Sequence, residues 1–229
     1  MHYAGIGSRT VPEGVLAFMS GLGRIFAFSG MTLRSGHAPG ADMAFEEGHG
    51  QAGGAMEIYL PWKRFNGSSS PLFGLPNLAG AGAIAREHHP GWAKMSNGAR
   101  MCIARNVYQV LGKDLASGAD FAVGWSRGSG GTEFTFRLAA SYSIPVVRLE
   151  RIAPLHDLPG GERLQIDPEW TAGLEKEGKR IFSPEAGSKD TELKVRIQDF
   201  VAEAARIFVD RVSEKQIVGT EACVCRQEL

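Results

Sequence analysis

Three glycine-rich segments constrain the fold of this chain most strongly, because each follows a short apolar run and precedes a stretch with helical spacing. They are Gly5–Arg9, Ser35–Asp42 and Gly128–Thr132. A glycine turn between a strand and a helix places free backbone N–H groups and the positive end of the helix dipole at one point, which suits a phosphate. One such turn is a weak signal, but three in one pattern predict a shared site for a nucleotide or another phosphate-bearing ligand.

The alternation of apolar runs and helical spacing predicts an α/β fold. Strands are expected near residues 2–6, 31–35, 57–60, 121–125 and 144–149. Between them lie segments in which apolar residues recur at a period near 3.6. This order is typical of a mainly parallel, doubly wound sheet with helices on both faces. Because the carboxyl ends of parallel strands meet at one edge, we expect Gly7, Gly36 and Gly131 to surround one pocket.

The composition of the sequence changes near residue 150, from glycine-rich loops to prolines, charged residues and helical spacing. This change predicts two parts. Residues 1–150 form the expected α/β domain, and residues 151–229 form a Pro-rich linker and an amphipathic helical extension. We expect irregular structure over 151–170 and one long helix over 191–214. That helix has an apolar stripe at helical spacing, made of Leu193, Ile197, Phe200, Val201, Ala204, Ala205, Phe208 and Val212. The stripe packs either on the main domain or across the interface of a homo-oligomer.

The balance of charges limits the classes of partner. Lys plus Arg and Asp plus Glu each total 25, so the net charge is zero and gives no global attraction to nucleic acid. A local basic patch that binds nucleic acid is still compatible with this balance. No apolar run approaches the roughly 20 residues of a membrane span, and the first residues resemble a strand rather than a signal peptide. Three cysteines indicate a reducing, cytoplasmic setting without a disulfide framework.

Several motifs occur together in an order that resembles a known superfamily. They are Gly5-Ile6-Gly7-Ser8-Arg9, Leu33–Asp42, Glu57–Trp62, Gly130-Gly131-Thr132 and Ile144–Val147. Over about residues 1–150 the chain resembles the SLOG superfamily, a Rossmann-like group that includes DNA-processing protein A and the lonely-guy phosphoribohydrolases. It is most similar to small, often phage-encoded members related to DNA-processing protein A. The resemblance implies a nucleotide site at the carboxyl ends of the strands, but enzymes, DNA binders and nucleotide sensors all share this fold.

The candidate ligand-binding residues come from the three loops and from one helix. They are Gly5, Gly7, Ser8, Arg9, Ser35, Gly36, Gly40, Asp42, Arg105, Gly130, Gly131 and Thr132. Arg9 would either clamp a phosphate in a bidentate contact or cap the next turn as a surface arginine. Asp42 would cap the second helix or contact a ribose hydroxyl. Arg105 matches the arginine of an Arg-Lys pair that reaches the nucleotide in lonely-guy enzymes, with Asn106 in place of the lysine.

The third loop departs from the phosphoribohydrolase pattern Pro-Gly-Gly-x-Gly-Thr-x-x-Glu. Aligning Gly131-Thr132 with that pattern puts Arg127 at the proline and Thr135 at the glutamate. Glu133 is near in sequence but lies about 200° away around a helix. The expected catalytic carboxylate is therefore missing, which counts against N-glycosidic hydrolysis, and no catalytic residue is assigned.

Other side chains carry weaker signals. Asp42 and Glu46 lie four residues apart and share a helix face, which suits acid–base chemistry or, more commonly, a solvated or capping role. His37 stands where the relatives carry a glycine. Trp62 is the best candidate for stacking on a base, with burial as the alternative. The adjacent His88-His89 lack supporting ligands, so we expect neither a metal nor a bound cofactor.

Three functions are compatible with these observations. The leading one is a cytoplasmic binding module that recognises a nucleotide or nucleotide-derived signal, and a phage origin would suit sequestration of a host signal. The second is an N-glycosidase that cleaves nucleoside 5′-monophosphates. The third is single-stranded DNA binding, which needs a basic groove with stacking aromatics and is disfavoured by the neutral overall charge.

Overall fold

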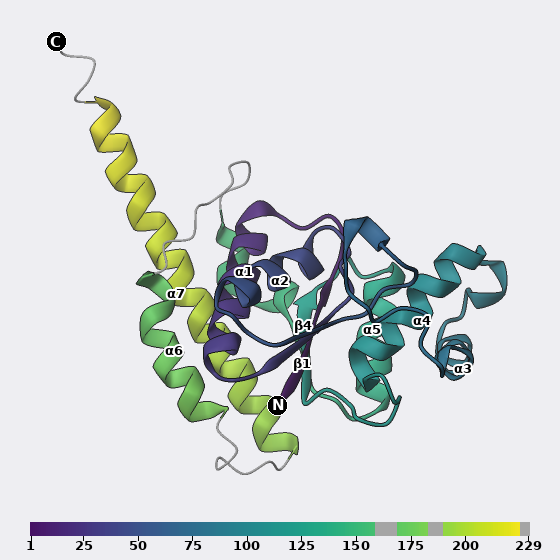
Figure 1. Cartoon of the computed structure of the whole chain (residues 1–229). Coiled ribbons are helices and arrows are strands. Elements are labelled where there is room, and N and C mark those ends of the chain that lie inside the picture. Colours follow the sequence, from purple (N-terminus) through teal and green to yellow (C-terminus); the bar gives the residue numbers. More distant parts are fainter. Residues whose placement is uncertain (159–168, 183–189, 225–229) are drawn as a thin grey trace.

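A parallel sheet forms the centre of the computed structural model, which describes residues 1–158, 169–182 and 190–224 (Figure 1). Within these residues the sheet has five strands in the order β3-β2-β1-β4-β5. The strands are β1 (His2–Gly7), β2 (Thr32–Ser35), β3 (Met56–Ile58), β4 (Phe121–Trp125) and β5 (Val146–Arg148). Every pairing is parallel. The predicted α/β class, the parallel sheet and the positions of its strands are confirmed.

Seven α-helices occur in the described residues. They are α1 (Glu13–Phe28), α2 (Ala41–Gln51), α3 (Leu78–His88), α4 (Asn97–Leu111), α5 (Gly130–Ser141), α6 (Glu169–Ile181) and α7 (Asp190–Val224). Short 3-10 turns lie at 65–67, 92–94, 149–151 and 153–157. Strand β1 ends on Gly7, and β2 leads into α2 through a loop that contains Gly36 and Gly40, because glycine permits the close approach of loop and helix that these turns require.

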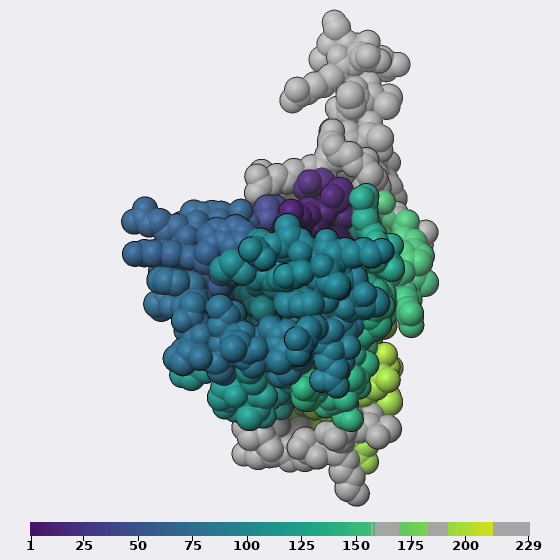
Figure 2. All heavy atoms as spheres, turned by 90° about the vertical axis from the view of Figure 1, so that its right-hand side faces the viewer, coloured from purple at the N-terminus to yellow at the C-terminus, as the bar shows by residue number. Residues whose placement is uncertain are grey.

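The helices cover both faces of the sheet. Figure 1 shows α1 and α2 on one side and α4 and α5 on the other, with α3 outside them. The central strands β1 and β4 are buried on both faces, as in β1, where Tyr3, Ala4 and Ile6 are at most 2% exposed, whereas the edge strand β3 is partly exposed. Figure 2 looks onto the second side, where the segment that joins β3 to α4 (blue to teal) spreads over much of the surface.

The C-terminal helices extend the core on the α1 side. The apolar stripe of α7 is buried from Leu193 to Phe208, in one continuous cluster with α1 and the sheet. Of the two alternatives for the stripe, the structure shows packing on the main body of the chain. Beyond Val212 only the helical backbone of α7 is described.

Helix α6 was not expected from the sequence. Irregular structure was expected up to residue 170. The structure shows 3-10 turns before residue 158, and residues 159–168 lie outside the described part. Helix α6 then begins at Glu169. Trp170 anchors this helix, stacked on Phe18 with ring centroids 6.0 Å apart. A Cβ at Gly21 would lie 1.9 Å from the indole ring, so Gly21 makes room for Trp170. None of the described helices is long and apolar enough to cross a bilayer.

Candidate ligand pocket

A cavity of about 600 Å³ opens at the carboxyl edge of the sheet, against the inner face of α4. It lies over β1 and β4, where the strand order turns from one side of the sheet to the other. Ligands of doubly wound sheets bind at such a switch point, because the two adjacent loops diverge and leave a crevice. Its walls come from the loops after β1, β2 and β4 and from α4.

The first loop is fixed by backbone contacts to its neighbours. Ser8 N donates to Trp125 O at 3.0 Å, and Ala41 N donates to Ser8 O at 3.3 Å. Gly7 is required here, because a Cβ would lie 2.3 Å from the Cβ of Ala41. These contacts join the ends of β1 and β4 to the start of α2, so the three loops are held as one unit.

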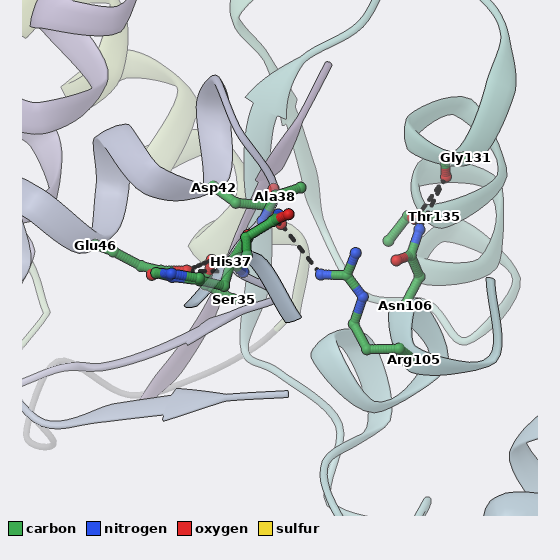
Figure 3. A network of polar contacts seen from close by, with 10 residues as sticks. Ser35, His37, Ala38, Asp42, Glu46, Arg105, Asn106, Gly131 and Thr135 are labelled. Carbon is green, nitrogen blue, oxygen red and sulfur yellow. Dashed lines mark hydrogen bonds and ion pairs between the residues drawn. The ribbon is translucent and has the colours of Figure 1, made fainter. Parts of the chain in front are cut away.

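Glu46 holds the second loop in place from the helix that comes after it. Its Oε1 accepts from Ser35 Oγ at 2.6 Å and from His37 N at 2.9 Å, and its Oε2 lies 2.6 Å from His37 Nδ1 (Figure 3). His37 adopts a φ of +56°, a left-handed conformation that explains why a glycine would suit the position. Glu46 therefore holds the loop in its conformation, because both of its carboxylate oxygens are bonded to Ser35 and His37.

Asp42 and Arg105 form an ion pair between α2 and α4. Arg105 Nη1 lies 3.3 Å from Asp42 Oδ2, and Arg105 and Asp42 are 5% and 3% exposed (Figure 3). Burial raises the pKa of Asp42 to about 6, although the charge of Arg105 acts to lower it. A Cβ at Gly36 would lie 1.0 Å from Arg105 Nη1, so this glycine leaves the space that the guanidinium occupies.

The third loop and the first turn of α5 form the opposite wall. Thr135 Oγ1 donates to Gly131 O at 2.7 Å and accepts from Asn106 Nδ2 at 2.8 Å. Glu133 points elsewhere. It makes a bidentate contact with Arg148 at 2.9 and 2.7 Å, and the hydrogen bonds from Arg148 lower the pKa of its carboxyl group. Thr135 thus lines the pocket at the position of the phosphoribohydrolase glutamate, while Glu133 is engaged outside it.

The pocket carries an excess of positive charge. Arg9 and Arg127 line it, are exposed, and make no hydrogen bond or ion pair with any other described residue. Arg105 contributes a third guanidinium. Among the described residues that line the pocket, Asp42 is the one carboxylate, and it is already bonded to Arg105. Such a surface attracts an anionic ligand.

Two buried polar side chains in the pocket are incompletely bonded. Arg105 Nε and Gln109 Nε2 have no hydrogen-bond partner among the described residues, although Gln109 is only 2% exposed. Unpaired buried donors are uncommon in folded proteins, and each calls for an explanation. Both side chains lie on α4 and line the pocket, but the two unpaired nitrogens are themselves buried from solvent.

The structure divides the candidate residues into those at the pocket and those behind it. At the pocket are Gly7, Ser8, Arg9, Asp42, Arg105, Gly131 and Thr132. The others support the wall from behind. Gly5 faces Leu33 and Phe45 in the core, and the buried Ser35 is hydrogen-bonded to Glu46. Gly36 lies under Arg105, Gly40 lies against the backbone of Ser8 and Arg9, and Gly130 begins α5. The second loop reaches the pocket through Ala38 and Asp42.

Sequence reasoning missed several residues of the wall. Gln109, Met95 and Cys102 line the pocket, and no motif marks any of them. Ser129 also lines it and belongs to the third glycine loop, but it was not among the candidate residues. For Cys102 and Gln109 the signal is their spacing from Arg105 by three and four residues, which places all three on neighbouring positions of α4. Trp62, considered for stacking, also lines the pocket and is 41% exposed, with its ring edge-to-face on Phe65.

Among the described residues there is no group of three side chains suited to hold a metal ion. Comparison of the chain with protein-family models, curated proteins and solved structures found no match. The resemblance to the SLOG superfamily therefore stays a prediction, and the functional proposal rests on the residues of the pocket.

Proposed function

We propose that this chain binds a nucleotide or nucleotide-derived ligand in the pocket over β1 and β4. The observation that carries the proposal is the meeting of the first and third glycine loops beside two unpaired cations, Arg9 and Arg127, among the described residues. Guanidinium groups and backbone N–H groups together are the usual means of holding a phosphate.

The geometry of the third loop supports a phosphate position near the start of α5. The first N–H groups of a helix have no partner within the helix and carry the positive end of its dipole. Gly131 and Thr132 stand in this first turn and line the pocket, and Ser129 precedes them. The remaining volume suits the nucleoside, since ligand sites of this kind span about 300–1,000 Å³. The exposed ring of Trp62 offers a face for stacking.

Binding without turnover is the better-supported form of this function. N-glycosidic cleavage needs a carboxylate near the ribose, and Glu133 is engaged by Arg148. Asp42 lines the pocket, but its Oδ2 accepts from Arg105 Nη1 and from Ala38 N. A protein that binds a nucleotide and releases it unchanged would sense or sequester a nucleotide signal.

Native mass spectrometry of the protein purified from cells tests this proposal. We expect an adduct with the mass of an intact nucleotide-type ligand that is released on denaturation. Recovery of free base and ribose phosphate after incubation with a nucleotide would establish hydrolysis instead. A protein without adduct that binds no member of a panel of nucleoside monophosphates, ADP-ribose and cyclic dinucleotides would contradict the proposal.

A further inference from the structure

The carboxyl group of Asp42 has one bonded oxygen and one open oxygen. Its Oδ2 accepts from Arg105 Nη1 at 3.3 Å and from Ala38 N at 3.4 Å. Its Oδ1 makes no hydrogen bond with a described residue, and it is not among the polar atoms that are buried without a partner. Because Asp42 lines the cavity, Oδ1 is the part of the carboxyl group that a ligand can reach.

Arg105 likewise has one open donor at the pocket. Its Nη1 donates to Asp42 and its Nε is buried, whereas its Nη2 makes no hydrogen bond with a described residue and is not among the buried unpaired atoms. Figure 3 shows Nη2 turned away from Asp42. An anion that accepts from Nη2 therefore lies close to Asp42, because both are bonded to the same guanidinium group.

A phosphate at this position places a second negative charge beside a carboxylate that is 3% exposed. Like charges repel more strongly in a buried site than in water, and protonation of the carboxylate removes the repulsion. We propose that anion binding in this pocket is coupled to the uptake of a proton by Asp42, so that the ligand is held more tightly in mildly acidic solution. The proton binds Oδ1, which then donates to the ligand, while Oδ2 keeps its bonds to Arg105 and Ala38 N. The inference rests on the proposed nucleotide function and adds its regulation by pH.

Charged or titratable side chains lie around Asp42 on its own helix, on α4 and on the first two loops. They are Glu46, Arg105, Arg9 and His37. Glu46 and His37 are bonded to each other, and α1 meets α2 through the small uncharged residues Ser20 and Gly23.

The surroundings place the titration of Asp42 in the range where a bound anion has the largest effect. Burial raises the pKa of Asp42 to about 6, with Arg105 acting to lower it and Glu46 acting to raise it. A bound anion acts in the same direction as Glu46, so proton uptake on binding is expected just above pH 6.

Calorimetric titration in two buffers with different ionisation enthalpies measures the protons taken up for each ligand bound. The probe is the tightest-binding member of the panel of nucleoside monophosphates, ADP-ribose and cyclic dinucleotides. If the bound probe raises the pKa of Asp42 by about one unit, the wild type should take up about half a proton more than Asp42→Asn at pH 6.5. Its affinity relative to Asp42→Asn should then rise about sixfold from pH 7.5 to pH 5.5. A phosphomonoester titrates near pH 6 as well, but this contribution cancels between the two proteins.

Glu47→Gln is the matched control, because it removes an exposed carboxylate from the same helix at a residue that does not line the pocket. It should bind the probe with the affinity and the proton uptake of the wild type. An NMR titration of the Asp42 carboxyl carbon in the wild type, with and without the probe, makes the same test without a variant. A titration midpoint that the probe leaves unchanged, or a ratio of affinities that stays constant with pH, would overturn the inference while leaving nucleotide binding intact. Failure of the wild type to bind any member of the panel would refute the proposed function itself.

Discussion

The free energy of unfolding should depend on pH through the carboxyl group of Asp42. A single substitution of this residue should remove that part of the pH dependence. Burial raises the pKa of Asp42 from 3.8 to about 6, so the folded protein holds this proton more tightly than the unfolded chain does. Stability is then greatest below pH 4 with respect to this group and falls as pH rises through 6. A shift of about two pKa units corresponds to about 3 kcal/mol.

Asp42→Asn keeps the shape and an acceptor for Arg105 but does not titrate. Urea unfolding of the two proteins between pH 4 and pH 7.5 gives the difference in their free energies of unfolding, in which the other titrating groups cancel. We expect the wild type to lose about 2.5 kcal/mol relative to Asp42→Asn over this range, because about 0.5 kcal/mol is already lost at pH 4. A difference that stays constant with pH would show that the carboxyl group has an ordinary pKa, and would refute the reasoning from burial.

Three further substitutions test the packing of α7, the role of Glu133 and the conformation of the second glycine loop. Phe200→Asp should lower the free energy of unfolding by at least about 3 kcal/mol, because the ring is 4% exposed; an unchanged Tm would mean that the stripe of α7 is not buried. Glu133→Gln should lower stability by about 1 kcal/mol and leave nucleotide affinity unchanged, and lost binding would place this glutamate in the pocket. Gly40 has a φ of +86°, and a Cβ there would lie 2.5 Å from Arg9 O, whereas the control Gly53 has a φ of +69° with nothing within 4 Å. Gly40→Ala should therefore lower the free energy of unfolding in urea more than Gly53→Ala does, and equal losses would contradict this.

The sheet could be predicted from the sequence because its signals are local. Strands β1, β4 and β5 each contain a short run of apolar residues, β1 ends on Gly7, and β2 is followed by a loop that contains Gly36 and Gly40. The missed helix α6 is amphipathic, but few of its residues are large and apolar, namely Trp170, Leu174 and Ile181, and a glycine stands at position 178. That glycine is explained only by packing, since a Cβ there would lie 2.7 Å from Ser29 Oγ.

The pocket could be predicted only in part, because long-range contacts decide which loop atoms face it. The motifs place Arg9 and Gly131 correctly beside the cavity, but they do not show that Gly36 lies behind a guanidinium from α4. The sequence marks Gln109 only by its spacing of four residues from Arg105. The burial of Gln109 without a hydrogen-bond partner among the described residues depends on how α4 packs on the sheet.

The affinity of an Arg9→Ala protein for nucleotides tests most directly whether the glycine loops form a phosphate site. A charge-assisted hydrogen bond contributes about 1.5–3 kcal/mol, so calorimetric titration should show binding weakened about tenfold to a hundredfold with the thermal stability unchanged. Arg86→Ala is the control, since Arg86 is an exposed arginine of α3 that does not line the pocket, and it should bind as the wild type does. Wild-type affinity in the Arg9→Ala protein would contradict a phosphate site at these loops.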